Sequence, residues 1–454
     1  MKSMAPRSPC VWRVIEASQR CCFPSSSASF RNVMDTLARD CFVIAPDLPG
    51  YGKLPPIEEP TFSRFAALME APVKFHHAAT TLPALFAIAL ASCTVSEDSA
   101  GRAGRGPTLI PLDSIRLTEA DTLYVGNPFT PVVDPYDGTI YVPDLFSNLV
   151  MRFARDGSLV VVYGRPGDGP GEFRAAGSVA VLDDTTVAVH DMMLRRLNLF
   201  DRHSGEFRRL RVMDSSLGTT PPLVRSDGVW LAAVAKERRE VRGTEPRSIA
   251  RWLPSSDTIL YLGPMPAEFM ESILGGFWSY ANQITVGALA FHDRGILRGW
   301  QAVNELFLIS PEGQILDTLD IPALRRRGVP DNLREILDIK RIDMKERTEL
   351  YSRLRQLHTL PDGSIAFTHH DQHVLKLVPM PVLSATLWVG VLSPDLRRAC
   401  VDTEVPTSQD ARSMETFRGD TLFQLDRRMV NERLETWLRL FRIDTERCDW
   451  ISLN

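Results

Sequence analysis

The feature that most constrains this chain is a repeat of short, β-rich runs separated by Asp-Gly turns. The first copy begins at residues 137–138. A second copy lies 47 residues further on, so that Asp144 aligns with Asp191 and Phe153 with Phe200 without a gap. Most of the chain is therefore expected to consist of similar structural units. Weaker copies are centred on residues 226–231, 304–313, 361–367 and 418–425.

A repeat of roughly 40–50 residues with about four strands per unit is typical of a β-propeller. A single four-stranded blade cannot cover its own two faces, so blades pack around a central axis and bury one another. The copies within residues 121–454 favour an all-β fold of six blades, with seven as the alternative. A closed ring also needs strands from both ends. Residues 110–117 are expected to pair with residues 437–443, which would leave no sheet edge open.

A glycine-rich segment, residues 164–173, joins the first two copies and ends in a Gly-Glu-Phe sequence. A phosphate-binding loop is not expected here, because no lysine of the Walker type follows. The segment resembles the linker between blades in six-bladed propellers of the NHL type, and this resemblance covers residues 121–454. It implies that the glycines occupy turns of positive φ and that Phe173 packs between two blades. Residues 330–357 depart from the repeat and are expected to form a charged amphipathic helix that caps one face.

Charge and hydropathy exclude several classes of protein. Lys and Arg number 52 against 56 Asp and Glu, and this net charge of -4 gives no basic surface for nucleic acid. No apolar run reaches about 18 residues, so an ordinary membrane-spanning helix is not expected. The 7 cysteines include no C-x-x-C pair, which argues against a zinc ribbon.

The surroundings of Cys93 resemble a targeting signal. Residues 82–91 form an apolar run of signal-peptide length, and Leu90-Ala91-Ser92-Cys93 is followed by a polar, flexible stretch. This arrangement resembles a bacterial lipoprotein signal. The resemblance implies cleavage before Cys93, lipidation of Cys93 and attachment to a membrane of the cell envelope, on the periplasmic or outer surface. The alternative is a short buried helix with a core cysteine.

Signal peptides begin at an amino terminus, so Met69 is the expected native start. The chain would then consist of an upstream extension, a signal segment, a polar linker with the ring-closing strand, and the propeller. These four parts cover residues 1–68, 69–93, 94–120 and 121–454.

The upstream extension resembles part of an α/β hydrolase. Residues 30–40 have helical periodicity, residues 41–45 read as a buried strand, and residues 46–52 contain an Asp-x-x-Gly-x-Gly loop. Together, residues 21–68 resemble the early β-α-β segment of that family. The G-x-S-x-G nucleophile motif is absent from the chain, and no later β-α alternation supplies the Asp and His of a triad. The extension is therefore expected to have no catalytic function.

Two further cysteines, Cys400 and Cys448, lie near the end of the chain. A lipid-anchored protein of the cell envelope experiences an oxidising environment. Because they would be the only cysteines of the mature form besides Cys93, a disulfide between them is expected, within the last blade.

Four of the 9 histidines, His358, His369, His370 and His373, lie close together in the sequence. Neighbouring residues of a strand point to opposite faces, so His369 and His370 are not expected to share a metal ion. Exposed histidines at a blade edge are the favoured interpretation.

Other candidate residues are few. Asp144 and Asp191 recur at one blade position and are expected to cap turns rather than line a channel. Residues 325–327 are three arginines, for which a solvated loop is favoured over a phosphate clamp. An aromatic cluster offers weak candidates for ligand contact, although burial under the helical insertion explains it equally well. Its members are Phe277, Trp278 and Tyr280.

The expected function is a lipid-anchored binding module for a small molecule, a glycan or a protein. It is expected to act as a monomer, without catalytic residues, metal or cofactor. One alternative is a propeller-class hydrolase or lactonase, which would need several Asp, Glu, Asn or His side chains to converge on a metal in the channel. A remnant α/β hydrolase is a further alternative, and the missing nucleophile argues against it. Fold alone does not decide among these functions.

Overall fold

The structure is a computed structural model, and the chain in it divides into two compact units, Met1–Ser96 and Glu97–Asn454. Each unit is described by itself. In the first unit the described residues are those of three short strands, β1 (Val14–Ile15), β2 (Arg20–Cys22) and β3 (Phe42–Ile44). In the second unit the described residues are 105–118, 123–213, 222–232, 246–283, 286–323, 325–338, 343–376, 382–407, 414–431 and 433–453.

The strands of the first unit form a sheet in which β3 lies between β1 and β2. β3 pairs antiparallel with β1 and parallel with β2. β3 falls within the strand expected at residues 41–45, whereas the helix expected at residues 30–40 lies outside the described residues. The likeness of this unit to an α/β hydrolase stays a prediction.

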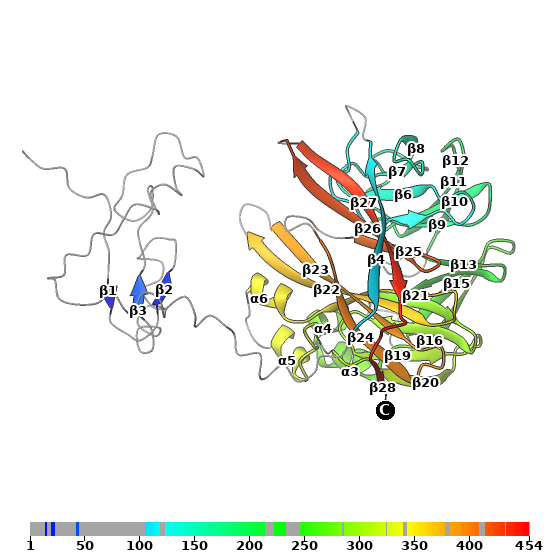
Figure 1. Ribbon diagram of the computed structural model, residues 1–454. Coiled ribbons are helices and arrows are strands. Elements are labelled where there is room, and N and C mark those ends of the chain that lie inside the picture. The colour runs from blue at the N-terminus through cyan, green and yellow to red at the C-terminus, as the bar shows by residue number, and fades with distance from the viewer. Residues whose placement is uncertain are drawn as a thin grey trace, which may run out of the picture. The chain divides into compact units, whose positions relative to one another are not determined.

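The described residues of the second unit form six antiparallel sheets, the blades of a propeller (Figure 1). This is the six-bladed, all-β fold that the repeat predicts. Blade 1 consists of β5 (Val132–Val133), β6 (Ile140–Asp144), β7 (Leu149–Phe153) and β8 (Leu159–Tyr163); blade 2 of β9 (Ala176–Val181), β10 (Thr186–Asp191), β11 (Arg196–Asp201) and β12 (Phe207–Val212); and blade 3 of β13 (Leu223–Arg225), β14 (Gly228–Ala232), β15 (Arg247–Leu253) and β16 (Thr258–Pro264). Blade 4 consists of β17 (Gly287–His292), β18 (Gly295–Trp300), β19 (Glu305–Ile309) and β20 (Ile315–Asp320); blade 5 of β21 (Arg353–Thr359), β22 (Ile365–Lys376), β23 (Val382–Leu392), β24 (Arg398–Val405) and β28 (Trp450–Ser452); and blade 6 of β25 (Met414–Arg418), β26 (Thr421–Val430), β27 (Arg433–Asp444) and β4 (Thr108–Leu117).

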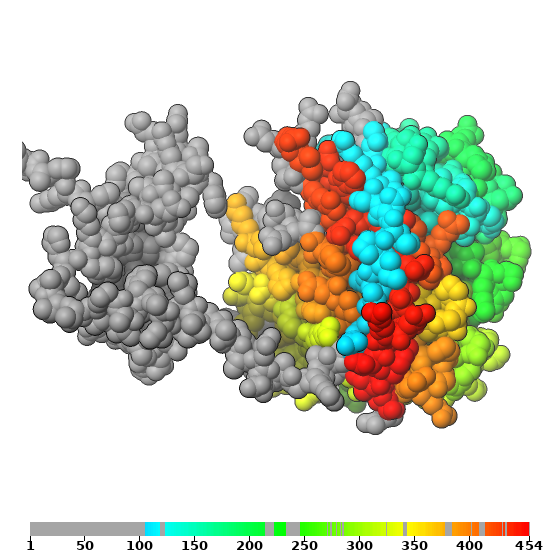
Figure 2. All heavy atoms as spheres, in the orientation of Figure 1, coloured from blue at the N-terminus to red at the C-terminus, as the bar shows by residue number. Residues whose placement is uncertain are grey.

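The ring closes through blade 6, which combines strands from both ends of the unit. β4 pairs with β27 from Thr108 opposite Asp444 to Leu117 opposite Thr436. Figure 2 shows the atoms of β4, in cyan, against those of the C-terminal segment, in red. The pairing that the sequence predicts between residues 110–117 and 437–443 falls within this register.

The last strand leaves blade 6 and joins its neighbour. β28 pairs with β24 of blade 5, and Cys448, just before β28, has its sulfur 2.02 Å from that of Cys400 on β24. The prediction that both cysteines belong to the last blade is wrong, because Cys400 lies in blade 5. The disulfide therefore joins β24 of blade 5 to the segment between β27 and β28, through which the chain passes from blade 6 to blade 5.

Apolar side chains on facing sheets form the cores between neighbouring blades. Six clusters each draw residues from two adjacent blades, and one of them joins blade 6 to blade 1 through Leu438, Leu117 and Val142. Complete burial of such a side chain stabilises a fold by roughly 1.5–3 kcal/mol. The stability of the ring therefore resides largely in the contacts between blades.

The glycine-rich linker between blades 1 and 2 brings a phenylalanine into one of these cores. Gly164 and Gly171 have φ values of 76° and 75°, a conformation that side chains with a Cβ rarely adopt. A Cβ on Gly164 would lie 2.1 Å from the ring of Phe173. Phe173 is fully buried beside Tyr163 and Phe200. These positions are the ones that the resemblance to NHL linkers implies.

Two connections between blades carry short helices. α3 (Ala267–Gly275) and α4 (Trp278–Gln283) follow blade 3, and α5 (Leu333–Asp338) and α6 (Met344–Glu349) follow blade 4. The single helix predicted at residues 330–357 is wrong, because the segment forms two helices and then enters strand β21. None of the helices in the described residues is long and apolar enough to cross a membrane.

The two helical connections form one unit, which we call the helical cap. The carboxylate of Asp338, at the end of α5, accepts hydrogen bonds from the backbone N–H groups of Ser279 and Tyr280, both at 2.8 Å. These bonds satisfy donors at the start of α4 that have no partner within that helix. Leu333 and Leu337 of α5 pack in the same apolar cluster as Phe269 of α3, Ala281 of α4 and Tyr351.

The turns between strands occupy two ends of the ring. The inner strands of a propeller run in one direction, so the turns between second and third strands share one end. We call this end the hairpin-tip face; among the described residues it holds the β6–β7, β10–β11 and β18–β19 turns and the adjoining ends of β22, β23, β26 and β27. β4 runs from the opposite end, at Thr108, to the hairpin-tip face, at Leu117. Its ten residues separate the two ends by about 30 Å.

Candidate functional site

The repeated aspartates hold the turns of the hairpin-tip face. Asp144 accepts hydrogen bonds from the backbone N–H groups of Asn127, at 2.5 Å, and Ser147, at 2.9 Å. Asp191 makes the equivalent bonds in blade 2, to its own turn and to the connection that enters its blade. Both aspartates are fully buried. They cap turns, as the sequence predicts, and do not form a carboxylate ring.

Each capped turn exposes a large apolar side chain two residues after its aspartate. Phe146 is 65% exposed and Met193 is 67% exposed. The ring of Tyr124, itself half exposed, lies 5.7 Å from that of Phe146. The longer hairpins of blades 5 and 6 also expose apolar residues, and the β26–β27 hairpin extends beyond the body of the ring (Figures 1 and 2). The exposed residues on these two hairpins are Leu375, Val430 and Leu434.

The hairpin-tip face is covered at blade 4. Ala302, in the β18–β19 turn, is buried in the apolar cluster of the helical cap, and Val303 packs against the same cluster. The corresponding connection of blade 3, residues 233–246, lies almost wholly outside the described residues. Among the described residues, this face therefore carries exposed apolar side chains at blades 1, 2, 5 and 6, and helices cover it at blade 4. The sequence analysis did not single out these exposed residues. For Phe146 and Met193 the available signal was an apolar residue two positions after each repeated aspartate.

The described chain enters the propeller at the opposite end. Arg105 N–H donates to the carboxylate of Asp449 at 2.6 Å, and Asp449 N–H donates to the carbonyl of Arg105 at 2.8 Å. These bonds place Arg105 beside the Cys448 segment, at the end where β4 begins. The start of the propeller and its hairpin-tip face thus lie at opposite ends of β4.

The central channel contains a narrow, mostly apolar cavity. Its volume is about 150 Å³, and the inner strands of five blades line it. Gln356, His358 and Thr416 are its polar residues, while valine, leucine, alanine, proline and phenylalanine side chains form the rest. The ring of His358 stacks on Phe417 with centroids 5.0 Å apart, and its Nε2 lies 2.9 Å from the carbonyl oxygen of Gly419. Within the described residues, no group of three or more His, Cys, Asp or Glu side chains could hold a metal ion. The set of donors that a channel metal requires is therefore not found in this lining.

The clustered histidines are mainly buried, and the prediction of exposed blade-edge histidines is wrong for His369 and His370. From Ile365 to Asp371 the residues of β22 are buried on both faces of the sheet, so the side chains of both His369 and His370 enter a core. His370 Nε2 lies 2.7 Å from Glu415 Oε2 of blade 6, and Thr368 donates to the other carboxylate oxygen at 2.6 Å. Burial opposes ionisation of Glu415, but the adjacent His370, Arg355 and Thr368 together outweigh it and lower the pKa of this carboxyl. The pair joins blades 5 and 6 and is closed to solvent.

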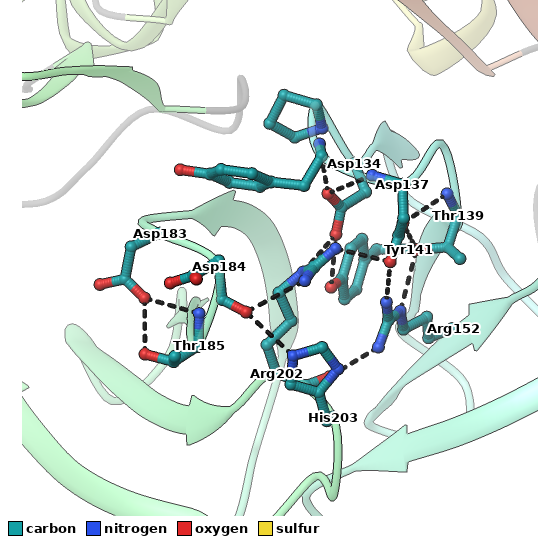
Figure 3. Close-up of polar contacts among 12 residues, drawn as sticks. Asp134, Asp137, Thr139, Tyr141, Arg152, Asp183, Asp184, Thr185, Arg202 and His203 are labelled. Atoms are coloured by element: carbon teal, nitrogen blue, oxygen red, sulfur yellow. Dashed lines mark hydrogen bonds and ion pairs between the residues drawn. The ribbon is translucent and has the colours of Figure 1, made fainter.

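A second buried polar network joins blades 1 and 2 (Figure 3). Arg202 Nε donates to Asp134 at 2.7 Å, and its terminal nitrogens reach Asp137 at 2.6 Å and the carbonyl of Asp184 at 3.0 Å. Burial opposes ionisation of Asp137, but hydrogen bonds from Thr139 and the arginine charges hold its pKa below the usual range. Asp134 and Arg202 are both buried, so this network is a structural clamp between blades.

The aromatic residues that the sequence singles out lie in the helical cap. Phe277 is half-buried beneath the guanidinium of Arg334, 5.1 Å from its ring centroid. Tyr280 is half-buried against the apolar cluster of the cap, and burial raises its pKa to about 12. The side chain of Trp278 lies outside the described residues. Burial within the cap thus accounts for Tyr280.

The prediction of a solvated loop at the three consecutive arginines is wrong for Arg326, which is buried. Its side chain is 1% exposed, and its Nη1 donates to both oxygens of the buried carboxylate of Asp402, at 2.8 Å each. Arg327 lies 3.4 Å from Asp371. These contacts attach the connection between blades 4 and 5 to the sheet of blade 5. Cys93, the predicted lipidation site, lies outside the described residues.

No protein-family model and no curated protein sequence matches the chain. It is similar to the solved structure of a member of the DUF4221 family from Bacteroides vulgatus, with a TM-score of 0.51, 9% identity and coverage of 75% of this chain and 99% of that chain. It is also similar to a protein from Bacteroides fragilis that is provisionally described as exported. That comparison has a TM-score of 0.50 and 12% identity, and covers 74% of this chain and 95% of the other. At these identities the likeness shows the fold alone.

Proposed function

We propose that this protein is a lipid-anchored β-propeller of the cell envelope that binds a partner protein on its hairpin-tip face. The observation that carries the proposal is the exposure of Phe146 and Met193 on turns, and of Leu434 at the start of β27, on the same face of three different blades. Scattered exposed apolar residues are ordinary, but a set gathered on one face of a ring is typical of an interaction surface. The buried aspartates hold two of these turns rigidly, which reduces the entropy lost on binding.

The anchor would direct this face away from the membrane. Lipidation of Cys93 would leave residues 94–107 as a tether that joins the propeller at the start of β4. The hairpin-tip face lies at the other end of that strand, about 30 Å away. A face turned away from the bilayer is suited to a protein partner and not to lipid. The description of the similar Bacteroides fragilis protein as exported agrees with an envelope location.

The partner is expected to present an apolar surface with charges of both signs. Charged side chains near the tips form local pairs of opposite sign, such as Arg174 with Asp168 and Arg116 with Glu435. We therefore expect short-range apolar contacts to supply the affinity and the paired charges to supply the specificity.

Site-specific photo-crosslinking in intact cells tests the proposal. A photoreactive phenylalanine analogue replaces Phe146, Met193 or Leu434 in turn, and the same analogue replaces Val160 and Ile315 as matched controls. The controls are exposed apolar residues on the outer strands β8 and β20. Discrete protein adducts are expected at the three tip positions and not at the controls. Phe146→Ser combined with Met193→Ser should abolish the adduct at Leu434 without changing the melting temperature.

Other occupants of the face give different results in the same series. An adduct between two copies of this chain would show that the face mediates self-association and does not bind a different protein. Flotation of the purified, unlipidated propeller with phosphatidylglycerol vesicles would show that the face binds a membrane surface and not a protein. Equal labelling at tips and controls would overturn the proposal.

The anchor has its own test. A chain that starts at Met69 should enter the membrane fraction, and Cys93→Ala should release it or leave its signal uncleaved. Cys93→Ala with unchanged fractionation and processing would contradict lipidation. N-terminal sequencing of the native product decides whether residues 1–68 are part of the working protein.

The aromatic residues of the helical cap are proposed as secondary contacts of the same partner. Phe277 is half-buried, and the cap covers blade 4 beside the open part of the face. Phe277→Ala should weaken the adduct at Leu434 with little effect on folding. An unchanged adduct would restrict Phe277, Trp278 and Tyr280 to a role in packing.

A further inference from the structure

The cavity in the central channel is lined mainly by apolar side chains, and its volume is about 150 Å³. A cavity of about this volume with an aliphatic and aromatic lining can hold a molecule the size of benzene. The described residues that line it include no Asp, Glu, Lys or Arg. An ion would lose its hydration there without gaining a counter-charge. The cavity therefore suits a small neutral ligand.

His358 offers such a ligand a hydrogen-bond acceptor. Its Nε2 lies 2.9 Å from the carbonyl oxygen of Gly419, which can only accept, so Nε2 carries the proton of this bond. Burial lowers the pKa of His358, although the bond to Gly419 acts in the opposite direction. The ring is therefore neutral at pH 7, and its second nitrogen, Nδ1, is unprotonated. Nδ1 makes no hydrogen bond with any described residue.

Gln356 places a second acceptor on the same strand. Its amide nitrogen donates to the backbone carbonyl of Glu415 in blade 6, so its amide oxygen is the acceptor that remains. Gln356 and His358 lie two positions apart on β21, and side chains at that spacing share one face of a strand. Both acceptors thus belong to the blade 5 side of the cavity, whereas Val132 and Leu223 supply apolar surface from blades 1 and 3.

The acceptor of His358 lies near one end of the channel. His358 and Phe417 are each one residue from the end of their strands, β21 and β25. The first strand of each blade runs away from the hairpin-tip face, so both residues lie toward the opposite end. Their rings are stacked, with an interplanar angle of 7°, which fixes the orientation of the imidazole. The cavity is separate from the hairpin-tip face, and the inference does not depend on the proposed function.

We propose that the channel cavity binds a small neutral molecule that consists of an apolar ring and a hydroxyl group, of which phenol is the simplest example. The ring would lie against Val132 and Leu223, and the hydroxyl would donate to Nδ1 of His358. A ligand bound in this way satisfies a buried acceptor, whereas a ring without a hydroxyl removes water from the acceptor and gives nothing in return.

Titration of the purified protein with phenol, benzene and benzoate, followed by saturation-transfer NMR, tests the site. Phenol is expected to bind at one saturable site, roughly 3- to 10-fold more tightly than benzene. Benzoate is expected not to bind, because the lining offers its charge no partner. His358→Phe keeps a ring stacked on Phe417 but removes the acceptor. In this variant the preference for phenol over benzene should vanish while benzene still binds.

Two variants that fill the cavity test where the ligand lies. Val132→Phe and Leu223→Phe each add volume at a half-buried residue of the lining, so each should abolish binding of phenol and benzene with little change in melting temperature. Val212→Phe, at an exposed residue of the outer strand β12, is the matched control and should bind as the parent does. Absence of saturable phenol binding, equal affinities of the parent for phenol and benzene, or retained binding in both cavity-filling variants would each overturn the proposal.

Discussion

Arg202 and Asp134 form a buried ion pair across the boundary between blades 1 and 2, with Nε and Oδ2 2.7 Å apart. The aspartate also accepts from the hydroxyl of Tyr141 at 3.0 Å. The arginine side chain is 4% exposed, and that of the aspartate 0%. A pair so enclosed has no water to replace a lost partner.

Arg202→Ala should therefore destabilise the propeller by about 3–5 kcal/mol, because it leaves a buried carboxylate without its counter-charge. Chemical denaturation of the mature domain measures this change. Arg174→Ala, which breaks the exposed pair with Asp168, is the control and should have little effect on stability, because water screens this pair. Equal effects of the two substitutions would contradict the clamp.

A second prediction concerns acid. Burial of His190 lowers its pKa to about 4, although the nearby Asp191 acts in the opposite direction. The unfolded chain takes up a proton near pH 6.5, and the folded chain does not until about pH 4. Stability is therefore complete above pH 6.5 and falls as the pH drops from 6.5 to 4, by about 3 kcal/mol at most from this residue.

His190→Leu should flatten the dependence of stability on pH in this window, and His358 and His369, whose pKa burial also lowers, should contribute to the remaining slope. Neither ring nitrogen of His190 has a hydrogen-bond partner, so the variant should lose no stability at pH 7. His203→Asn, at an exposed histidine, is the control. An unchanged slope in His190→Leu would mean that His190 is not buried in its neutral form.

The third prediction concerns ring closure. Removal of residues 435–454 deletes most of β27 and all of β28, and exposes both β26 and β4 as unpaired edges. We expect insoluble protein, since open edges pair between molecules. Removal of residues 446–454 alone keeps β27 and should leave a soluble, less stable ring. A folded, monomeric product from the longer deletion would contradict the closed ring.

The fourth prediction concerns Cys400 and Cys448. A bond between them closes a loop with a sequence separation of 48, and its reduction should lower stability by about 3–4 kcal/mol in the chain-entropy account. Thiol labelling of the unreduced, denatured propeller should find neither cysteine reactive. Labelling of both would show that the disulfide does not form in the native protein.

The fifth prediction concerns the upstream extension. Within the described residues, the clusters between blades contain none before Leu109. A chain without residues 1–68 should therefore melt at the same temperature as the full chain. A loss of several degrees, or of an esterase activity, would show that the extension contributes to the protein.

The sequence was most informative where a local turn carries the fold. The repeated Asp144 and Asp191 predict both the blade period and their own role, because an Asx turn depends on residues close in sequence. It was least informative where distant segments meet. The apolar spacing of Leu350 and Leu354 suits a helix, but pairing of β21 with β22 makes Leu354 part of a strand. Tertiary pairing outweighs local propensity there.

The candidate sites follow the same rule. His370 reads as a surface histidine until blade 6 supplies Glu415, which is 45 residues away in sequence. Val132 and His358 come from different blades, and the cavity that they line arises from the packing of the inner strands around one axis. Cys400 and Cys448 meet at blade 5 because the chain leaves blade 6 after β27 and adds β28 to the sheet of blade 5. A count of repeats does not detect this change of blade.

Two hydrogen bonds between Arg105 and Asp449 hold the two ends of the described ring together. Because the two ends of the described ring touch, a short peptide could join them, and new termini could be opened at the β10–β11 turn beside Met193. Such a circular permutant keeps every strand pair, although its chain starts in a different blade. If Cys93 is lipidated as proposed, the permutant would also carry its membrane tether at the hairpin-tip face, and that face would then lie against the bilayer.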